Sequence, residues 1–226
     1  MSYIAASYVK WVESAGARVV PILYDMSPAQ VRARFAMING LLLPGGGASL
    51  RPGHQFYDTA KLLVDLAVEA NDKGDYFPIQ GTCLGMETLS IIISRNYTIL
   101  SNFDAEDARL AMSAVVENPR LLDFFDVISL SLDKSGNAYV STLEAIRYPI
   151  VATQWHPEKN PFEWTPSLHI PHTDNALAAE QQVVVCGAVL QLQEDDVLIY
   201  NWPPSFTGRH EYEGEEKDFE HPLAAV

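Results

Sequence analysis

The sequence is poor in basic residues: 15 lysines and arginines stand against 29 aspartates and glutamates, which gives a formal net charge of −14 at pH 7. An acidic surface repels nucleic-acid backbones and anionic membranes, so we expect neither as a partner. Long apolar runs are also lacking. The longest, Val183 to Leu190, is far shorter than the ~20 residues that a bilayer-spanning helix needs. The sequence therefore predicts no membrane span.

Cysteine is scarce as well, because the chain has only Cys83 and Cys186. Their separation argues against a metal knuckle or a disulfide framework, and a free cysteine is most often a small buried apolar residue. The first residues lack the basic segment and uninterrupted apolar core of a secretory signal, so the sequence by itself indicates a cytoplasmic protein.

What the sequence does have is apolar residues, which make up 48% of its 226 positions. This length and composition fit one sizeable soluble domain. Residues 209–226 differ from the rest, with six acids and two bases. Such a run is typically solvated, so we expect a domain over residues 1–208 followed by a mobile acidic tail.

Apolar runs of strand length alternate with amphipathic helical patterns. Because strands that are apolar throughout are typical of parallel sheets covered on both faces, the order of elements predicts an α/β fold. Alternation from residue 128 onward, with an Asp-Lys-Ser-Gly turn at 133–136, predicts a hairpin up to residue 143. We expect strands near residues 18–22, 38–43, 77–80 and 150–154, and helices near residues 4–15, from 28 onward, 55–72, 86–94 and 174–192.

The stretch from Gly81 to Gly85 reads Gly-Thr-Cys-Leu-Gly and lies between an expected strand and an expected helix. This is the cysteine form of the nucleophile elbow, in which glycines permit a tight turn and the helix N-terminus favours a thiolate. The alternative is a structural cysteine in a glycine-rich loop. The motif alone does not decide between them.

A second stretch follows the strand expected at 150–154. A thiolate nucleophile needs a base, and the base needs a third group that fixes its tautomer. His156 can be the base and Glu158 the third group. The carboxyl ends of strands in an open α/β sheet gather functional groups, so we expect His156 to meet Cys83 there. A structural or surface histidine is the alternative.

Other candidates are weaker. The glycine run at 45–47 lacks the Lys-Ser/Thr of a phosphate loop, which argues against a nucleotide site. His169 and His172 have a possible metal spacing, but no acidic or thiol side chains cluster with them. We therefore expect neither a metal nor an organic cofactor.

With these motifs in order, the sequence resembles the class I glutamine amidotransferase-like superfamily, and within it the gamma-glutamyl hydrolase family. The resemblance implies a three-layer α/β/α sandwich with a mostly parallel central sheet. It also implies a homodimer and a lysosomal, vacuolar or extracellular location. It fades beyond about residue 208. The matching segments are Ser2–Lys10, Glu13–Pro21, Ile38–Gly40, Gly74–Pro78, Gly81–Gly85, Tyr148–Pro149, Gln154–Lys159 and Glu163–Trp164.

The resemblance assigns catalytic roles to matching positions. It implies that Cys83 is the nucleophile, that His156 is the general base and acid, and that Glu158 orients His156. It implies an oxyanion hole formed by the backbone N–H of Leu84 and by one from the glycine turn, for which we choose Gly46. The expected substrates are folylpoly-γ-glutamates and related γ-glutamyl peptides, cleaved through a thioester.

Glu87 separates this family from its relatives. Amidotransferases that supply ammonia to a synthetase usually have glutamine four residues after the nucleophile, whereas the hydrolases have glutamate. A carboxylate there can pair with the α-ammonium of a γ-glutamyl group, although a solvated helix glutamate is the alternative. Gln154 and Trp155 are expected to line the same pocket, unless Trp155 only packs. A glutaminase subunit with a synthetase partner remains the alternative enzyme.

Two departures from the family pattern lead to further expectations. The family has a core strand before its first helix, whereas this sequence starts at the helix, so we expect an unfilled position and exposed edges in the sheet. Only 25 residues separate Ile99 from Phe124, where the family has a longer insert with a substrate-site histidine. These departures are typical of a shortened isoform or of an incomplete gene model. A third interpretation is therefore a catalytically impaired product that pairs with a full-length enzyme.

Overall fold

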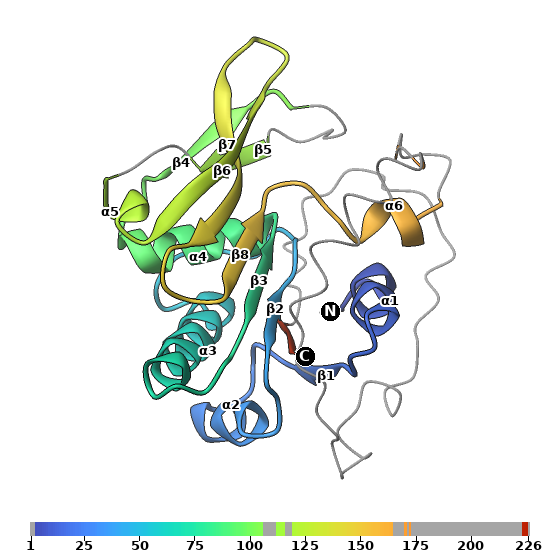
Figure 1. Cartoon of the computed structure of the whole chain (residues 1–226), viewed down its shortest axis with the longest axis vertical. Coiled ribbons are helices and arrows are strands. Elements are labelled where there is room, and N and C mark those ends of the chain that lie inside the picture. The colour runs from blue at the N-terminus through green and yellow to red at the C-terminus, as the bar shows by residue number, and fades with distance from the viewer. Residues whose placement is uncertain are drawn as a thin grey trace.

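A seven-stranded sheet forms the centre of the computed structural model, which describes residues 3–105, 112–115, 119–164, 170, 172 and 223–225 (Figure 1). The strand order is β1-β9-β2-β3-β8-β7-β6. These strands are β1 (Val20–Ile22), β2 (Leu41–Leu43), β3 (Ile79–Thr82), β6 (Phe125–Leu132), β7 (Ala138–Ala145), β8 (Ile150–Thr153) and β9 (Leu223–Ala225). A separate antiparallel pair consists of β4 (Leu100–Phe103) and β5 (Met112–Val115).

The middle of the sheet is parallel. β2 pairs in parallel with β3, and β3 pairs in parallel with β8, so that Gly81 lies opposite Leu43 on one side and Ala152 on the other. The remaining pairs are antiparallel. The carboxyl ends of β2, β3 and β8 consequently meet at one edge of the sheet, which is where an open α/β sheet places functional groups.

Helices cover both faces of the sheet (Figure 1). In β2, Leu42 belongs to the apolar cluster with α1 (Ala6–Ser14), whereas Leu41 and Leu43 belong to the larger cluster on the opposite face. Alternate side chains of a strand point to opposite faces, so one strand contributes to both cores. The predicted three-layer α/β/α fold is confirmed. The other helices are α2 (Pro28–Phe35), α3 (Gln55–Asp72), α4 (Leu84–Ser94), α5 (Pro119–Leu122) and α6 (Lys159–Phe162).

The hairpin of β6 and β7 confirms the prediction from alternating residues, and it extends from residue 125 to 145. Asp133 closes its turn by accepting hydrogen bonds from the backbone N–H groups of Ser135 and Asn137 at 2.9 and 2.7 Å. Gly136 has φ of 83°, which glycine adopts readily. β6 is the last strand of the sheet, and the hairpin extends beyond β8 (Figure 1).

The position between β1 and β2 is occupied, so the expected unfilled position does not lie there. β9 lies between them and pairs antiparallel with both. These three residues of segment 209–226 thus belong to the sheet, and the mobile tail stays a prediction for the rest of that segment. The helix expected at 174–192, Cys186, His169 and the rest of the acidic segment lie outside the described residues.

Candidate active site

Cys83 occupies the turn between β3 and α4, with φ of 54° and ψ of −111°. A positive φ at a non-glycine residue is strained, and such strain persists only where the surroundings enforce it. The backbone N–H of Cys83 donates to the carbonyl of Thr153 at 2.7 Å, which ties the turn to the end of β8. The predicted strand–turn–helix elbow is therefore present, with the cysteine at the N-terminus of α4.

The glycines that flank Cys83 are required by close packing. A Cβ at Gly85 would lie 2.0 Å from the carbonyl oxygen of Leu43, and a Cβ at Gly81 would lie 2.6 Å from a methyl carbon of Leu89. Cβ atoms do not approach backbone atoms that closely, so Gly85 allows α4 to pack directly against β2. The G-x-C-x-G pattern thus has a steric origin in this chain.

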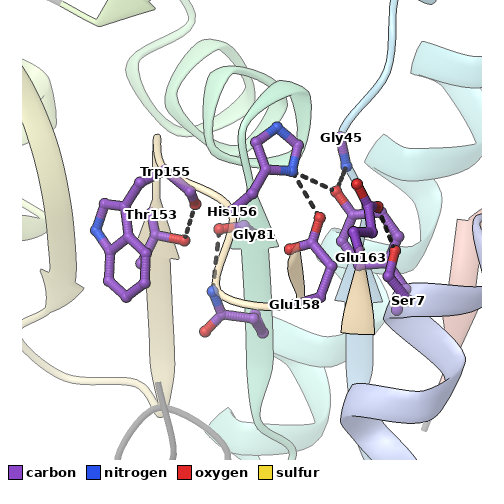
Figure 2. Close-up of polar contacts among 10 residues, drawn as sticks. Ser7, Gly45, Gly81, Thr153, Trp155, His156, Glu158 and Glu163 are labelled. Carbon is purple, nitrogen blue, oxygen red and sulfur yellow. Dashed lines mark hydrogen bonds and ion pairs between the residues drawn. The ribbon is translucent and has the colours of Figure 1, made fainter. Parts of the chain in front are cut away.

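His156 and Glu158 form a close pair after β8 (Figure 2). His156 Nδ1 donates to Glu158 Oε1 at 2.6 Å, and the Glu158 carboxylate is fully buried. Burial alone lowers the pKa of the imidazole, but the charges of Glu158 and Cys83 outweigh it and raise the pKa of His156 to about 10. A Cβ on Gly45 would approach both His156 Cε1 and Cys83 Cβ, so these two side chains adjoin the same point. The structure therefore brings Cys83, His156 and Glu158 together.

Tyr8 of α1 is a fourth member of the cluster, and sequence reasoning missed it. Its hydroxyl accepts a hydrogen bond from the Gly45 N–H at 2.7 Å and lies 3.2 Å from His156 Nδ1. Burial and the charges of Glu158 and Cys83 raise the pKa of Tyr8 well above its usual value, so the phenol stays neutral. Helical periodicity marks Tyr8 as a core residue, but only the fold reveals which polar groups its hydroxyl meets.

Gly45 lies at the point where the side chains of Tyr8, Cys83 and His156 converge. A Cβ there would lie 2.7 Å from His156 Cε1, 2.7 Å from the Tyr8 hydroxyl and 3.2 Å from Cys83 Cβ. The Gly45 N–H is already bonded to Tyr8, whereas the next residue, Gly46, is exposed. Of the two glycines in the turn, Gly46 therefore has the backbone that faces solvent.

Glu87 is buried rather than solvated, which excludes the interpretation as a surface helix residue. It lies in the first turn of α4 with 7% of its surface exposed, and the side-chain amide of Gln154 donates to its Oε1 at 3.3 Å. Burial raises the pKa of Glu87 to about 7, and the hydrogen bond from Gln154 only partly opposes this. The structure thus places Glu87 and Gln154 in contact, as one polar pair behind the cysteine turn.

The remaining predicted site residues are also close by in the fold. Leu84 is the first residue of α4, directly after Cys83. Trp155 precedes His156, and its ring N–H donates to the Thr142 hydroxyl on β7 at 3.2 Å, which anchors the indole to the sheet. Trp155 is half-buried. Part of the Trp155 ring therefore packs against the sheet, and the rest is exposed.

Other features bear on function less directly. The ring of His172 stacks on that of Trp164, with centroids 3.8 Å apart. No group of three or more His, Cys, Asp or Glu side chains suited to a metal ion occurs among the described residues. Within the same part of the chain, every helix is too short or too polar to cross a membrane.

Comparison with known proteins finds similar sequences along most of this chain. The family model of Peptidase C26 matches residues 1–96. Gamma-glutamyl hydrolase of Rattus norvegicus is 37% identical over 255 aligned residues, covering 91% of this chain and 80% of the relative. Gamma-glutamyl hydrolase of Homo sapiens is 35% identical (91% and 79% covered), and gamma-glutamyl hydrolase 1 of Arabidopsis thaliana is 34% identical (92% and 72% covered).

A crystal structure of a putative GMP synthase subunit from Thermoplasma acidophilum has a TM-score of 0.45 and 14% identity, and covers 82% of this chain and 89% of its own. The 255 aligned residues of the rat enzyme exceed the 226 of this chain, so some of its positions have no counterpart here. Identity above 30% over nearly the whole chain, with most of each relative covered, shows that the chain belongs to the gamma-glutamyl hydrolase family.

Proposed function

We propose that the protein hydrolyses γ-glutamyl bonds of folylpoly-γ-glutamates and related γ-glutamyl peptides, with Cys83 as nucleophile. The observation that carries the proposal is the arrangement at the end of β3 and β8: a cysteine on a strained turn, a histidine that adjoins the same glycine as the cysteine, and a buried carboxylate 2.6 Å from Nδ1 of that histidine. These are the parts that covalent catalysis by a thiolate requires.

In the first step, the Cys83 thiolate attacks the carbonyl carbon of the γ-glutamyl amide. The electron pair of the C=O bond moves to oxygen, and the backbone N–H groups of Leu84 and Gly46 stabilise the oxyanion. When the intermediate collapses, the C–N bond breaks and protonated His156 gives its proton to the departing amine. The products are the free amine and a γ-glutamyl thioester on Cys83.

In the second step, water attacks the thioester carbonyl. His156, now neutral, takes a proton from the water, and the C–S bond breaks to regenerate the thiolate. Glu158 remains charged in both steps, because it stabilises the imidazolium and holds Nδ1 in the donating tautomer. The second product is the released γ-glutamyl group as a free γ-carboxylate.

Glu87 gives the proposed site its preference for glutamate. A substrate α-ammonium beside Glu87 would stabilise the ionised carboxylate, offsetting the burial that raises its pKa to about 7. Gln154 orients the carboxylate through its 3.3 Å hydrogen bond. Trp155 forms a wall next to this pair.

The test compares the wild type with Cys83→Ser and Cys83→Ala on a γ-glutamyl-glutamate peptide and on free glutamine. We expect wild-type turnover of the peptide, loss of turnover in both variants, and a γ-glutamyl hydroxamate when hydroxylamine intercepts the thioester. Circular dichroism melts of all three proteins verify folding. Faster turnover of glutamine would support the glutaminase alternative. A folded wild type that forms no hydroxamate would refute the proposed mechanism and support the impaired isoform.

A further inference from the structure

The chain leaves the sheet one residue before His156. β8 ends at Thr153, and its ladder continues through Gln154, whose N–H donates to a carbonyl of β7 at 2.8 Å. Residues 155–158 then form bends and turns that lead to α6. His156 and Glu158 both belong to this segment. In this part of the described chain the ladder therefore stops short of the histidine, and other contacts hold the histidine in place.

Two threonine hydroxyls hold Trp155, the residue directly before His156. The hydroxyl of Thr153 donates to the backbone carbonyl of Trp155 at 2.9 Å (Figure 2). The ring N–H of Trp155 donates to the hydroxyl of Thr142 at 3.2 Å. Thr142 and Thr153 lie opposite one another in the register of β7 and β8. One cross-strand pair thus fixes both the backbone and the ring of Trp155.

The hydroxyl of Thr142 is itself oriented by a neighbouring strand. The hydroxyl of Ser129 on β6 donates to it at 2.8 Å. Together with the bond from Trp155, this contact occupies both lone pairs of the Thr142 oxygen. A row of hydrogen bonds therefore runs from β6 through β7 to the segment that carries His156. Side chains that position a functional group must themselves be held in this way.

Thr153 also connects this segment to the cysteine turn. The bond to Glu158 sets the ring of His156 relative to its own segment, because the two residues are only two positions apart. By contrast, the backbone carbonyl of Thr153 accepts from the Cys83 N–H at 2.7 Å, while its hydroxyl holds Trp155. A displacement of about 1 Å in a reacting group can lower a rate by about 100-fold. The hold on Trp155 thus bears on where His156 lies relative to Cys83.

We propose that Thr142 and Thr153 are positioning residues for the hydrolysis, which hold Trp155 at its ring and at its carbonyl and thereby place His156 beside Cys83. Both threonines act through Trp155 and not on the substrate. The proposal rests on the proposed function, in which His156 transfers protons during attack on and release from Cys83. Its test therefore includes one measurement that needs no turnover.

Thr142→Val keeps the shape of the side chain and its preference for a strand, and removes the acceptor of the Trp155 N–H. We expect kcat on a γ-glutamyl-glutamate peptide to fall about 10-fold, with KM changed much less. Thr142→Ser keeps the hydroxyl and should retain most of the rate. Thr153→Val should behave like Thr142→Val. Thr59→Val is the matched control, because the Thr59 hydroxyl donates to the Tyr24 carbonyl at 2.8 Å from α3, and its loss should lower stability without lowering kcat.

Trp155→Phe removes the ring N–H that Thr142 accepts. In that background Thr142→Val should cause no further loss of kcat, because the hydrogen bond is already absent. The measurement without turnover is the rate at which iodoacetamide alkylates Cys83, followed by mass spectrometry of the peptide that contains it. A charged imidazole beside a cysteine stabilises the reactive thiolate. Alkylation should therefore slow several-fold in Thr142→Val and in Trp155→Phe, and remain unchanged in Thr59→Val.

The outcomes separate this proposal from the proposed function. A wild type that hydrolyses no γ-glutamyl peptide would refute the proposed function, and the alkylation rates would then decide the role of Thr142. Alkylation and kcat unchanged in Thr142→Val would overturn the positioning role. So would an equal loss from Thr142→Val with and without Trp155→Phe, since Thr142 would then not act through the indole. If Thr142→Val fails to fold in circular dichroism melts, Trp155→Phe provides the same test, and unchanged alkylation in it would overturn the proposal.

Discussion

Tyr8→Phe removes one oxygen atom from the candidate site and leaves the ring in place. That oxygen is the acceptor for the Gly45 N–H at 2.7 Å, and Gly45 is buried. A buried donor left without its partner destabilises the folded state by about 1–3 kcal/mol. We therefore expect a lower free energy of unfolding, of this size, with the apolar packing of α1 unchanged.

The same oxygen lies 3.2 Å from His156 Nδ1. Its loss releases the glycine turn and removes a polar neighbour of the proposed catalytic histidine, so one hydroxyl affects both. A geometric error that removes about 1.4–2.7 kcal/mol of transition-state stabilisation lowers kcat by about 10–100-fold. We expect this loss in kcat, with KM for a γ-glutamyl peptide changed much less.

Tyr57→Phe is the matched control. Tyr57 is also a buried tyrosine, its hydroxyl bonds Tyr97 at 3.3 Å, and it lies on α3 rather than in the site. This variant should lose stability without losing kcat. Urea unfolding and steady-state kinetics on both variants separate the two effects. If Tyr8→Phe were destabilised yet kept its kcat, Tyr8 would be a packing residue and the reasoning would be refuted.

Three further predictions concern packing, topology and pH. Gly85→Ala should unfold the protein or destabilise it by about 3 kcal/mol or more, because its Cβ would meet the Leu43 carbonyl at 2.0 Å. Gly47→Ala is the control and should leave stability unchanged, because the space around Gly47 is open. Thermal melts of the two variants test this difference. Ala224→Pro should lower stability by about 1–3 kcal/mol through a lost ladder hydrogen bond of β9, and an unchanged melt would show that β9 does not complete the sheet. Glu87→Gln should remove a pH dependence of the free energy of unfolding. Burial raises the pKa of Glu87 from 4.5 to about 7, so the buried carboxyl costs no stability below pH 4.5. As the pH rises through 7 the carboxyl ionises in the folded protein, and the wild type loses about 3 kcal/mol at most. Urea unfolding at pH 4.5 and pH 8 checks the sign, and equal gains at both pH values would contradict it.

Local patterns in the sequence were sufficient for the elbow and the hairpin. Gly81 and Gly85 flank Cys83 because of contacts within a strand–turn–helix unit, so a short motif records them. The turn at Asp133 is likewise closed by residues within four positions of it. Such motifs can be recognised in a single sequence, because the contacting residues are only a few positions apart.

Contacts between distant residues were not visible in the same way. The burial of Glu87 depends on Gln154, 67 positions away, and the hydroxyl of Tyr8 meets Gly45 across 37 positions. β9 is a three-residue strand whose position is determined wholly by the edges of β1 and β2. Whether a segment forms a strand depends on such neighbours more than on its composition. The acidic composition of residues 209–226 therefore gave no signal for β9.

The role of α1 follows from two adjacent polar residues on its buried face. Tyr8 bonds the glycine turn after β2 and contacts His156, and the Ser7 hydroxyl donates to Glu163 Oε1 at 2.7 Å (Figure 2). His156 and Glu163 bracket the segment that contains Glu158, so α1 holds this segment at both ends. Because side chains that position a catalytic group must themselves be fixed, docking of α1 is coupled to the geometry of the histidine. The helix that opens the described chain therefore supports the proposed catalytic site as much as the strand that leads to the cysteine.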